Sequence, residues 1–450
     1  MSNIFSQSLS PAFTRQSVDE YFVKPMFMAE DIRGLITVRT DVKGTELLNR
    51  ISRPSYLTKP KVSAGFTPTG SFSLTTTEIT VKPMALEFEQ NARAFWGAII
   101  EQLLASGYKE DDVEQMKSPD VWNKIMLPLI SQAGQDDLIR QMFFANPVAE
   151  TLSSGVPTGT IDTNYSGYTG FFTHLMKDLL AGTIPSGQHV TIASATSAVK
   201  QEAVETLTYG ATTTSITINI NGVDYIQAYA SSAAATMTAW LATHKTTIEA
   251  RAGVNGVIVT NPSSAAIKIV SKYKGGKFTV TTTATGGGSF AESATVASVS
   301  KGSLSANEAD ATLEDMLDAM TPEMNEYDLV FMLTGSMWRN LVHTMKNRTT
   351  GLGDTVMLNG LKVPTYEGIP IIVRYDWDKW ITSAHYGIQP HRAMLTTSKN
   401  LLFATDGTSD SEMIETWYNQ EAQMRRYRVQ YKAQTAYLHK ELIVLAGFGD

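Results

Sequence analysis

The feature that most constrains the fold of this chain is an abrupt loss of charge across residues 186–306. Charged residues make up 18% of the whole chain, but they are only half as frequent in this stretch as in the rest of it. The stretch is also rich in Ser, Thr and Ala. Turn-forming segments mark its two ends, Ile184-Pro185-Ser186-Gly187 and Lys301-Gly302-Ser303. A compositional break of this kind predicts an independently folding domain inserted into a host domain.

The insert shows the sequence patterns of a small α+β module. Ile216, Ile218 and Ile220 alternate with polar residues, which predicts a half-buried strand. Asn221-Gly222 follows and favours a type I′ turn, because both central positions of that turn take a positive φ. We therefore expect a return strand over residues 223–228.

A helix and further strands are expected in the rest of the insert. Apolar residues at helical spacing predict the helix, with Ser231 or Ser232 as its N-cap; they are Met237, Trp240, Leu241, His244 and Ile248. Short strands are expected over 257–259, 267–270 and 278–283, with a turn at 274–277. Gly286-Gly287-Gly288 is expected to form a flexible loop.

The first host segment combines an arm, a strand and several helices. Residues 1–60 lack sustained periodicity, and we expect an extended arm that a partner surface orders. Residues 71–81 alternate, which predicts one strand of a hairpin. Helices are expected over 121–127, 138–143 and 171–180. The longest predicted helix spans about five turns and ends at Gly107; its apolar stripe is Phe88, Ala92, Phe95, Trp96, Ile99, Ile100, Leu103 and Leu104.

The second host segment is expected to contain mostly strands. Asn307 is a candidate N-cap for a helix that buries Leu313 and Met316. A further helix is expected over 337–345. Strands are expected over 328–334, 369–374, 393–397, 401–404, 427–431 and 442–446, with a hairpin over 356–363; the strands 393–397 and 401–404 are expected to pair with each other. Helices first and strands last predict an α+β host.

Composition excludes several classes of function. The chain of 450 residues has no cysteine, which excludes a disulfide scaffold, a thiolate nucleophile, a Cys-ligated zinc site and an iron–sulfur cluster. A net charge of −7 argues against a dedicated nucleic-acid-binding protein. No apolar run reaches the about 18 residues of a transmembrane helix, and the first residues lack the pattern of a secretory signal. We expect no membrane association.

Several segments match known sites only in part. Residues 275–279 have a glycine pair before a lysine, as phosphate loops do, but the first glycine of that motif is Ser271, so a β-turn is expected. Residues 162–167 resemble the opening of a calcium loop, but position twelve is Thr173 rather than an acid. Asp376-Trp377-Asp378 is expected to lie in a loop. His385 and His391 are six residues apart, which is not a compact metal-ligand spacing.

The densest basic run is Arg425-Arg426-Tyr427-Arg428, followed by Lys432. On a strand, the even-numbered residues 426, 428, 430 and 432 share one face. Three interpretations remain open: a solvated face, a salt-bridge surface between subunits, or a surface that contacts phosphate. No catalytic residue, cofactor-binding residue or metal ligand is assigned anywhere, so we expect a non-enzymatic protein that works by assembly.

A family resemblance rests on the order of seven segments along the chain. They are 64–83 (AGFTPTGSFSLTTTEITVKP), 86–106, 167–185 (GYTGFFTHLMKDLLAGTIP), 326–345 (EYDLVFMLTGSMWRNLVHTM), 363–375 (VPTYEGIPIIVRY), 392–406 and 431–446. In this order they resemble the major capsid proteins of tailed double-stranded DNA phages, which have the Hong Kong 97-like fold. The segment 167–185 is similar to capsid proteins from phages of Bacteroidetes-type hosts. The insert has no counterpart in the minimal fold.

The resemblance implies a domain order for the whole chain. Residues 1–60 would be the N-terminal arm, 61–85 the extended loop, and 86–185 the peripheral domain with the start of the axial domain. Residues 186–306 would be the insert, 307–410 the axial domain, and 411–450 the C-terminal strands that return to the peripheral domain.

The resemblance also implies partners and a location. The protein would self-assemble into pentamers and hexamers of an icosahedral shell in the virion, after assembly in the bacterial cytoplasm. Portal, scaffold and decoration proteins would be its partners, and packaged DNA would be contacted at most non-specifically. Lysines 59, 61 and 82 are conceivable cross-link donors, but no site is assigned. The alternatives are a phage tail tube or sheath subunit, a surface adhesin, and an enzyme.

Overall fold

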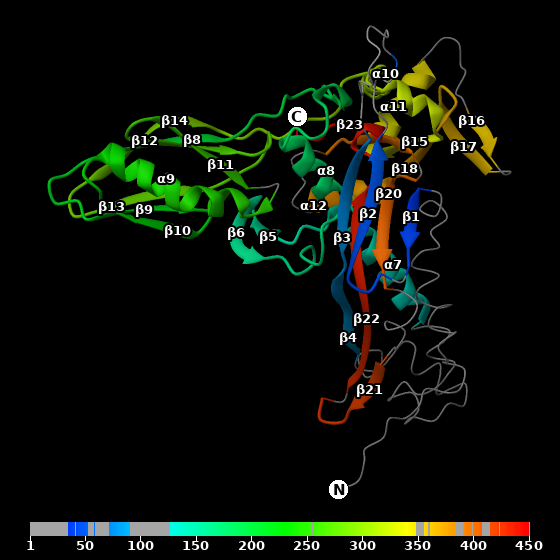
Figure 1. Ribbon diagram of the computed structural model, residues 1–450, viewed down its shortest axis with the longest axis horizontal. Helices are drawn as coiled ribbons and strands as arrows, with labels where there is room; N and C mark the ends of the chain where they lie inside the picture. Colours follow the sequence, from blue (N-terminus) through cyan, green and yellow to red (C-terminus); the bar gives the residue numbers. More distant parts are fainter. Residues whose placement is uncertain are drawn as a thin grey trace, which may run out of the picture. The chain divides into compact units, whose positions relative to one another are not determined.

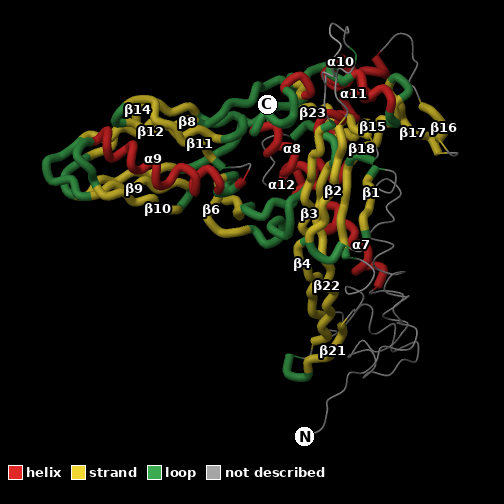
Figure 2. The backbone as a smooth tube through the Cα atoms, viewed as in Figure 1, coloured by secondary structure: helices red, strands yellow, loops and turns green. Residues whose placement is uncertain are grey.

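The computed structural model describes residues 35–40, 42–52, 58, 72–90, 127–253, 256–347, 355–358, 361–383, 390–397, 399–406, 415–422 and 424–449. These residues form a mixture of helices and mainly antiparallel strands, so the predicted α+β class is confirmed (Figures 1 and 2). The chain divides into two compact units. Unit 1 comprises Met1–Arg33, Thr37–Leu138 and Leu402–Leu438, and unit 2 comprises Gly34–Ile36, Ile139–Leu401 and His439–Asp450.

Unit 1 is built on a five-stranded sheet. Its strands follow the order β1 (Ile36–Arg39), β20 (Leu401–Thr405), β22 (Met424–Tyr437) and β21 (Glu415–Asn419), and β4 (Lys82–Gln90) also pairs with β22. A separate hairpin consists of β2 (Thr45–Ser52) and β3 (Ser73–Thr80). A small core of Val42, Ile79, Val81, Leu402, Ala404 and Ala436 joins the base of this hairpin to β20 and β22. The helix α7 (Leu127–Phe144) continues from unit 1 into unit 2.

Unit 2 contains a seven-stranded mixed sheet. The order is β16 (Thr355–Leu358), β17 (Leu361–Tyr366), β18 (Ile369–Arg374), β15 (Leu329–Thr334), β19 (Ala393–Thr397), β23 (Ile443–Ala446) and β7 (His189–Val190). β15 runs parallel to β18 and antiparallel to β19. Every residue of β15, β19 and β23 is buried, which explains why these strands are continuous apolar runs in the sequence.

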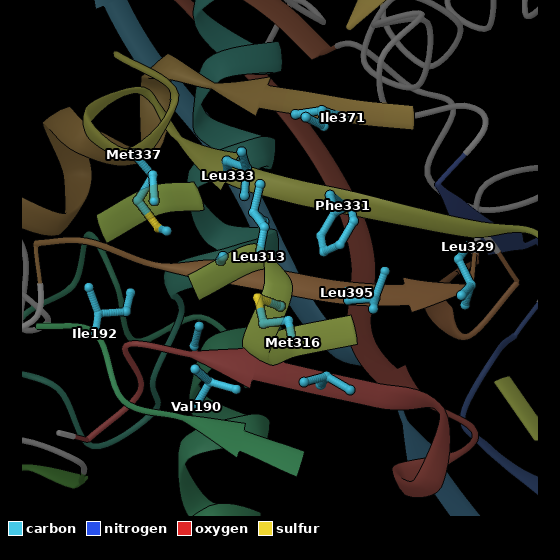
Figure 3. Close-up of a cluster of buried hydrophobic side chains, with 14 of the residues drawn as sticks. Val190, Ile192, Leu313, Met316, Leu329, Phe331, Leu333, Met337, Ile371 and Leu395 are labelled. Atoms are coloured by element: carbon cyan, nitrogen blue, oxygen red, sulfur yellow. The ribbon is translucent and has the colours of Figure 1, made fainter. Parts of the chain in front are cut away.

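One face of this sheet packs against α10 (Glu308–Asp318) and α11 (Gly335–Asn347). Leu313 and Met316 of α10 and Met337 of α11 meet Phe331 and Leu333 of β15, as Figure 3 shows. Full burial of one such side chain is worth about 1.5–3 kcal/mol, so this cluster is a main source of the stability of unit 2.

A second buried cluster is aromatic and surrounds an arginine. It involves α7, α8 (Phe171–Leu180) and α12 (Tyr375–Ser383). The ring of Phe172 lies 4.8 Å from that of Trp377 and 5.2 Å from that of Phe448, measured between centroids. The fully buried Arg392 places its guanidinium carbon 5.1 Å from the Phe172 centroid and 4.9 Å from the Phe448 centroid. These cation–π contacts stabilise a charge that would otherwise be costly to bury.

The insert forms two sheets closed by one helix. The four-stranded sheet has the order β11 (Val257–Ser263), β12 (Ala266–Ser271), β8 (Glu202–Thr208) and β14 (Ser289–Val296). The three-stranded sheet has the order β10 (Val223–Ala228), β9 (Ser215–Ile220) and β13 (Val280–Thr285). Helix α9 (Ala233–Ala250) packs with both sheets around one core, in which Trp240 is fully buried and donates from Nε1 to the carbonyl of Tyr225 at 3.0 Å.

Local predictions for the insert are confirmed in detail. Asn221 and Gly222 take φ values of 52° and 79°, as a type I′ turn requires, and β9 and β10 pair on either side of them. Of the two candidate N-caps, Ser232 is the one used: its hydroxyl accepts the Ala235 amide at 3.1 Å. In the host, the predicted helix 171–180 is α8 with the same bounds, and Gly182 follows with φ 68°.

Two strands of the insert were not predicted. In β8 the buried positions are Ala203, Glu205 and Leu207, so a carboxylate interrupts the apolar alternation. In β14 most residues are small or polar. The segment Gly286-Gly287-Gly288, expected to be a flexible loop, connects β13 directly to β14 as a tight turn, and Thr212 donates to the carbonyl of Gly286.

The long helix predicted from Phe88 is wrong at its start. Residues 86–90 belong to β4, where Leu86 and Phe88 alternate with Glu87 and Glu89 and the backbone pairs with β22. The apolar pattern of so few residues is compatible with a strand as well as with the start of a helix. The rest of this predicted helix, and the helix expected over 121–126, lie outside the described residues.

The predicted pairing of 393–397 with 401–404 is also wrong. Both strands exist, but β19 lies between β15 and β23, whereas β20 lies between β1 and β22. Asn400 separates them: its side chain donates to the His439 carbonyl at 2.9 Å and accepts the His439 amide at 2.7 Å. Each strand is buried at every position and therefore needs neighbours of its own.

Three smaller expectations also differ. Residues 45–52, expected within an extended arm, form β2 and pair with β3. Asp376 and Asp378, expected in a loop, lie in the first turn of α12. Asn307 precedes α10 as predicted, but it adopts φ 62° and makes no side-chain capping bond.

Candidate assembly surface

The β2–β3 hairpin carries two of the most exposed large apolar side chains among the described residues, and a third lies just before β3. Its two strands pair along their whole length, from Thr45 opposite Thr80 to Ser52 opposite Ser73. The pairing is reinforced at the base, where the Val81 amide donates to the Gly44 carbonyl at 3.1 Å, and further along, where the Thr76 hydroxyl donates to the Asn49 side chain at 2.9 Å.

The two faces of this hairpin differ in environment. On one face Ile79 is 1% exposed, within the small core of unit 1. On the other face Leu47 is 59% exposed and Leu74 is 64% exposed, and Phe72, just before β3, is 69% exposed. They are three of the five most exposed large apolar side chains in the described part of the chain. We call Leu47, Phe72 and Leu74 the apolar ribbon face.

Such a face is energetically unfavourable in water. A two-stranded hairpin is marginally stable alone, because too little of its surface is buried. Covering these three partly exposed side chains would contribute about 1–2 kcal/mol each. The arrangement therefore suits a surface that another molecule covers. These residues were not among the predicted site residues, because residues 45–52 show no regular alternation of apolar and polar side chains.

The basic run lies on β22, opposite acidic residues of β4. Arg426 pairs with Glu89 at 3.0 Å and Arg428 pairs with Glu87 at 2.7 Å, each from Nε to a carboxylate oxygen. The predicted sharing of one strand face is confirmed. Because these four side chains are 39–55% exposed, each ion pair contributes no more than about 1 kcal/mol. These two arginines thus have carboxylate partners within the chain, which weakens the interpretation as a surface that contacts phosphate.

A shallow hollow lies beside these two ion pairs. It has a volume of about 300 Å³ and is lined by Glu87, Phe88, Glu89, Trp417, Arg426, Tyr427 and Arg428. Phe88 stacks on Tyr427 across the β4–β22 pair, with 4.6 Å between ring centroids. The Arg428 guanidinium carbon lies 5.6 Å from the Trp417 ring centroid, so Trp417 forms a cation–π contact while remaining 39% exposed.

The loops that resemble binding motifs are turns with their polar groups already engaged. In the glycine pair before Lys277, the Gly275 amide donates to the Val199 carbonyl at 2.8 Å and the Gly276 amide to the Tyr273 carbonyl at 3.2 Å. These amides are therefore unavailable to a phosphate. In the segment that resembles a calcium loop, the carboxylate of Asp162 accepts the Asn164 amide at 3.0 Å. Thr173 is buried and donates to the Ala145 carbonyl at 2.7 Å.

One polar cluster in unit 2 was not predicted. The Ser336 hydroxyl lies 2.8 Å from Nδ1 of His391, and Nε2 of His391 lies 3.0 Å from the Gly302 carbonyl. Burial lowers the pKa of His391 and raises the pKa of the nearby Asp378. The cluster ties the end of the insert to the host sheet. His385 lies outside those residues.

Metal and membrane sites were searched within the described ranges. There, no group of three or more His, Asp or Glu side chains is arranged to hold a metal ion. No helix in that part of the chain is long and apolar enough to cross a membrane. Of the three lysines considered as cross-link donors, Lys82 is exposed at the start of β4, and the other two lie outside the described residues.

Comparison with known proteins gives structural similarity without sequence similarity. No protein-family model matches the chain, and no curated protein matches it. A chain of the satellite phage P4 procapsid, which includes the size-determination protein Sid, is 11% identical with a TM-score of 0.41, over 96% of both chains. A chain of the mature capsid of bacteriophage PhiM1 is 8% identical with a TM-score of 0.36, over 92% of this chain and 86% of that one.

A third similar structure comes from another kind of particle. It is a chain of the SrpI encapsulin complex from Synechococcus elongatus, 9% identical with a TM-score of 0.37, over 100% of this chain and 91% of that chain. At identities and TM-scores this low, the likeness does not establish a family for the protein.

Proposed function

We propose that this protein is a structural, non-enzymatic capsid subunit with the Hong Kong 97-like fold. In this proposal it assembles as pentamers and hexamers into an icosahedral shell that encloses the double-stranded DNA of a tailed phage. The observation that carries the proposal is the apolar ribbon face, Leu47, Phe72 and Leu74, on a hairpin that is covered on its other face only. The order of sequence segments that resembles capsid proteins supports it independently.

A subunit that exposes an apolar hairpin gains free energy when a neighbouring copy covers it, and many identical contacts become strong when the assembly closes. The ion pairs of Arg426 with Glu89 and Arg428 with Glu87 are partly exposed and add little stability within one subunit, and their pattern of charges can orient a neighbour electrostatically. The basic run then belongs to a surface between subunits.

Each region has a proposed role. Residues 1–60 serve as the N-terminal arm and 61–85 as the extended loop; residues 45–52 of the arm pair with 73–80, which supports a role for them in that loop as well. Residues 86–185 and 411–450 form the peripheral domain together with the start of the axial domain, and 307–410 form the rest of the axial domain. The insert, 186–306, lies on the outer surface of the shell.

The proposal extends to partners and location. The particle is part of the virion and assembles in the bacterial cytoplasm with portal, scaffold and decoration proteins. A net charge of −7 suits a container that contacts its DNA only non-specifically.

The test replaces the two leucines of the apolar ribbon face. The double variant Leu47→Lys/Leu74→Lys should reduce the fraction of protein in sedimenting particles at least tenfold, because lysine ammonium groups would have to be buried wherever a neighbour covers the hairpin. The variant Ile226→Lys is the matched control: Ile226 is 60% exposed on β10 of the insert. It should assemble as the unmodified protein does.

The outcomes separate the candidate functions. Closed shells from the unmodified protein and from Ile226→Lys, with loss in the double variant, would support the proposal. Helical tubes would favour a tail tube or sheath subunit instead. Normal shells from the double variant would refute the role of the hairpin, and a monomer at high concentration under all salt conditions would refute a shell function.

A further inference from the structure

Three loops meet at the end of the insert that lies farthest from its connections to the host. They are residues 209–214, 229–232 and 286–288, and we call them the tip loops. The strand register brings them together: Ser289 pairs with Thr208, and Ser215 pairs with both Ala228 and Thr285. In Figure 1 they form the end of the insert beyond the labels of β13 and β14.

Two tyrosines form a fixed aromatic platform in the tip loops. Tyr209 and Tyr229 stack with 4.7 Å between their ring centroids and an interplanar angle of 16°. The Tyr229 amide donates to the Thr214 carbonyl at 2.9 Å, and the Tyr209 hydroxyl donates to the Ala211 carbonyl at 3.3 Å. Tyr209 is nevertheless 51% exposed, so one face of a positioned ring is open to solvent.

The surroundings of this platform are polar but uncharged. The tip loops include no acidic or basic side chain; apart from the two tyrosines they consist of threonine, serine, glycine and alanine. No charged residue occurs in 206–223, 225–244 or 278–291, the segments that lead into and out of these loops. Thr212, Ser231 and Ser232 are exposed in these loops.

We propose that the tip loops bind a neutral carbohydrate through the exposed face of Tyr209. A sugar ring presents C–H groups on one face, which pack against an aromatic ring, and hydroxyl groups at its edge, which suit Ser, Thr and backbone partners. Because the ring is already held by its stack and its hydrogen bond, little conformational entropy is lost on binding.

The absence of charge in these segments decides between ligand classes. A single-stranded nucleic acid also stacks on aromatic rings, but it requires Lys or Arg to offset its phosphates, and the tip segments contain none. An anionic polysaccharide requires the same cations. One open ring face gives weak binding, so each site should have a Kd in the millimolar range, about −4 kcal/mol.

This inference concerns the folded chain alone and holds whether or not the protein forms shells. The test uses the unassembled full-length protein and affinity electrophoresis in gels that contain dextran, mannan or galactan, with hyaluronan and a single-stranded oligonucleotide as charged comparisons. Retardation by at least one neutral polysaccharide and by neither charged polymer is expected. Saturation-transfer NMR with irradiation of the aromatic protons should then show transfer to the C–H protons of the corresponding oligosaccharide, and this transfer should fall in Tyr209→Ala.

Variants make the site assignment falsifiable. Tyr209→Ala should weaken binding at least fivefold, whereas Tyr209→Phe, which keeps the ring, should retain it within about twofold. The control is Tyr327→Ala, since Tyr327 is also 51% exposed but lies in the host before β15. Circular dichroism verifies that the variants are folded. No retardation by any neutral polysaccharide, equal losses in Tyr209→Ala and Tyr327→Ala, or preference for a charged polymer would each overturn the proposal.

Discussion

Replacement of Arg251 by methionine should weaken the attachment of the insert to its host. Arg251, at the end of α9, forms a two-pronged ion pair with Glu150 of the host strand β5 (Glu150–Ser153): Nε lies 2.6 Å from Oε1 and Nη2 lies 2.9 Å from Oε2. The guanidinium also donates to the carbonyls of Ile220 at 2.7 Å and Asn221 at 2.9 Å. The side chains are 16% and 3% exposed.

The free-energy cost of Arg251→Met follows from the polar groups that lose a partner. In Arg251→Met the buried carboxylate of Glu150 keeps one donor, the Gly159 amide at 2.6 Å, and the carbonyls of Ile220 and Asn221 each lose one donor. Removal of one member of a buried ion pair costs about 3–5 kcal/mol. The double variant Glu150→Met/Arg251→Met leaves no unpaired charge, so its cost should be smaller than the sum of the single variants, with a coupling energy of about 1–3 kcal/mol.

Hydrogen exchange is the direct assay. If the loss is local, the Gly159 amide should exchange roughly a hundredfold to a few thousandfold faster in Arg251→Met. The control is Lys268→Met, which breaks an ion pair with Glu202 of the same insert at 2.7 Å, where both side chains are about one-third exposed. That variant should cost no more than about 1 kcal/mol. Equal effects of the two variants, or strict additivity in the double variant, would refute the reasoning.

Three further predictions concern the insert. Burial lowers the pKa of Lys272 to about 8 from its ordinary 10.5. Above pH 8 the unfolded chain therefore binds more protons than the folded chain, so the free energy of unfolding should rise between pH 8 and 9.5. Urea unfolding checks this rise relative to Lys272→Met, and a fall in the free energy of unfolding would contradict the prediction. Gly222→Ala should lower the free energy of unfolding by about 1–2 kcal/mol in thermal unfolding, because Gly222 has a φ of 79°, which alanine adopts only with strain. Gly187→Ala should change it little, because no atom lies within 4 Å of the added Cβ. Equal effects of the two variants would show that the positive φ of Gly222 is not the cause. Trp240→Phe should cost about 1–3 kcal/mol in urea unfolding, from lost volume and the lost hydrogen bond to the Tyr225 carbonyl, and a neutral result would show that the core adapts.

Local sequence signals predicted much of the insert. The alternation of Ile216, Ile218 and Ile220, the Asn221-Gly222 turn and the helix around Trp240 each depend on contacts close in sequence or on one backbone preference. These predictions are correct because the local conformational preference of each segment agrees with its conformation in the folded protein.

Predictions that depended on distant partners failed. Phe88 was assigned to a helix because its apolar neighbours continue at helical spacing, whereas its strand conformation depends on β22, near the other end of the chain. Likewise, the pairing of β19 and β20 was inferred from their proximity in sequence, but each strand is placed by neighbours from other segments. No local pattern reports such long-range pairing.

The candidate assembly surface was predictable only in part. The shared face of Arg426 and Arg428 followed from strand periodicity, but their partners Glu87 and Glu89 lay in the segment assigned to a helix. Leu47 was missed because residues 1–60 were expected to form an extended arm, and Leu74 because an apolar residue on a strand is expected to be buried. Only the structure shows which face of the hairpin lacks cover.

In the proposed function, copies of this chain build a closed shell by covering one another's hairpins. An electron cryo-microscopy reconstruction of particles assembled from the purified protein shows whether they do. We expect an icosahedral shell of pentamers and hexamers in which Leu47 and Leu74 are buried against a neighbouring subunit. A shell in which both side chains remain exposed to solvent, or a protein that stays monomeric at every concentration, would contradict it.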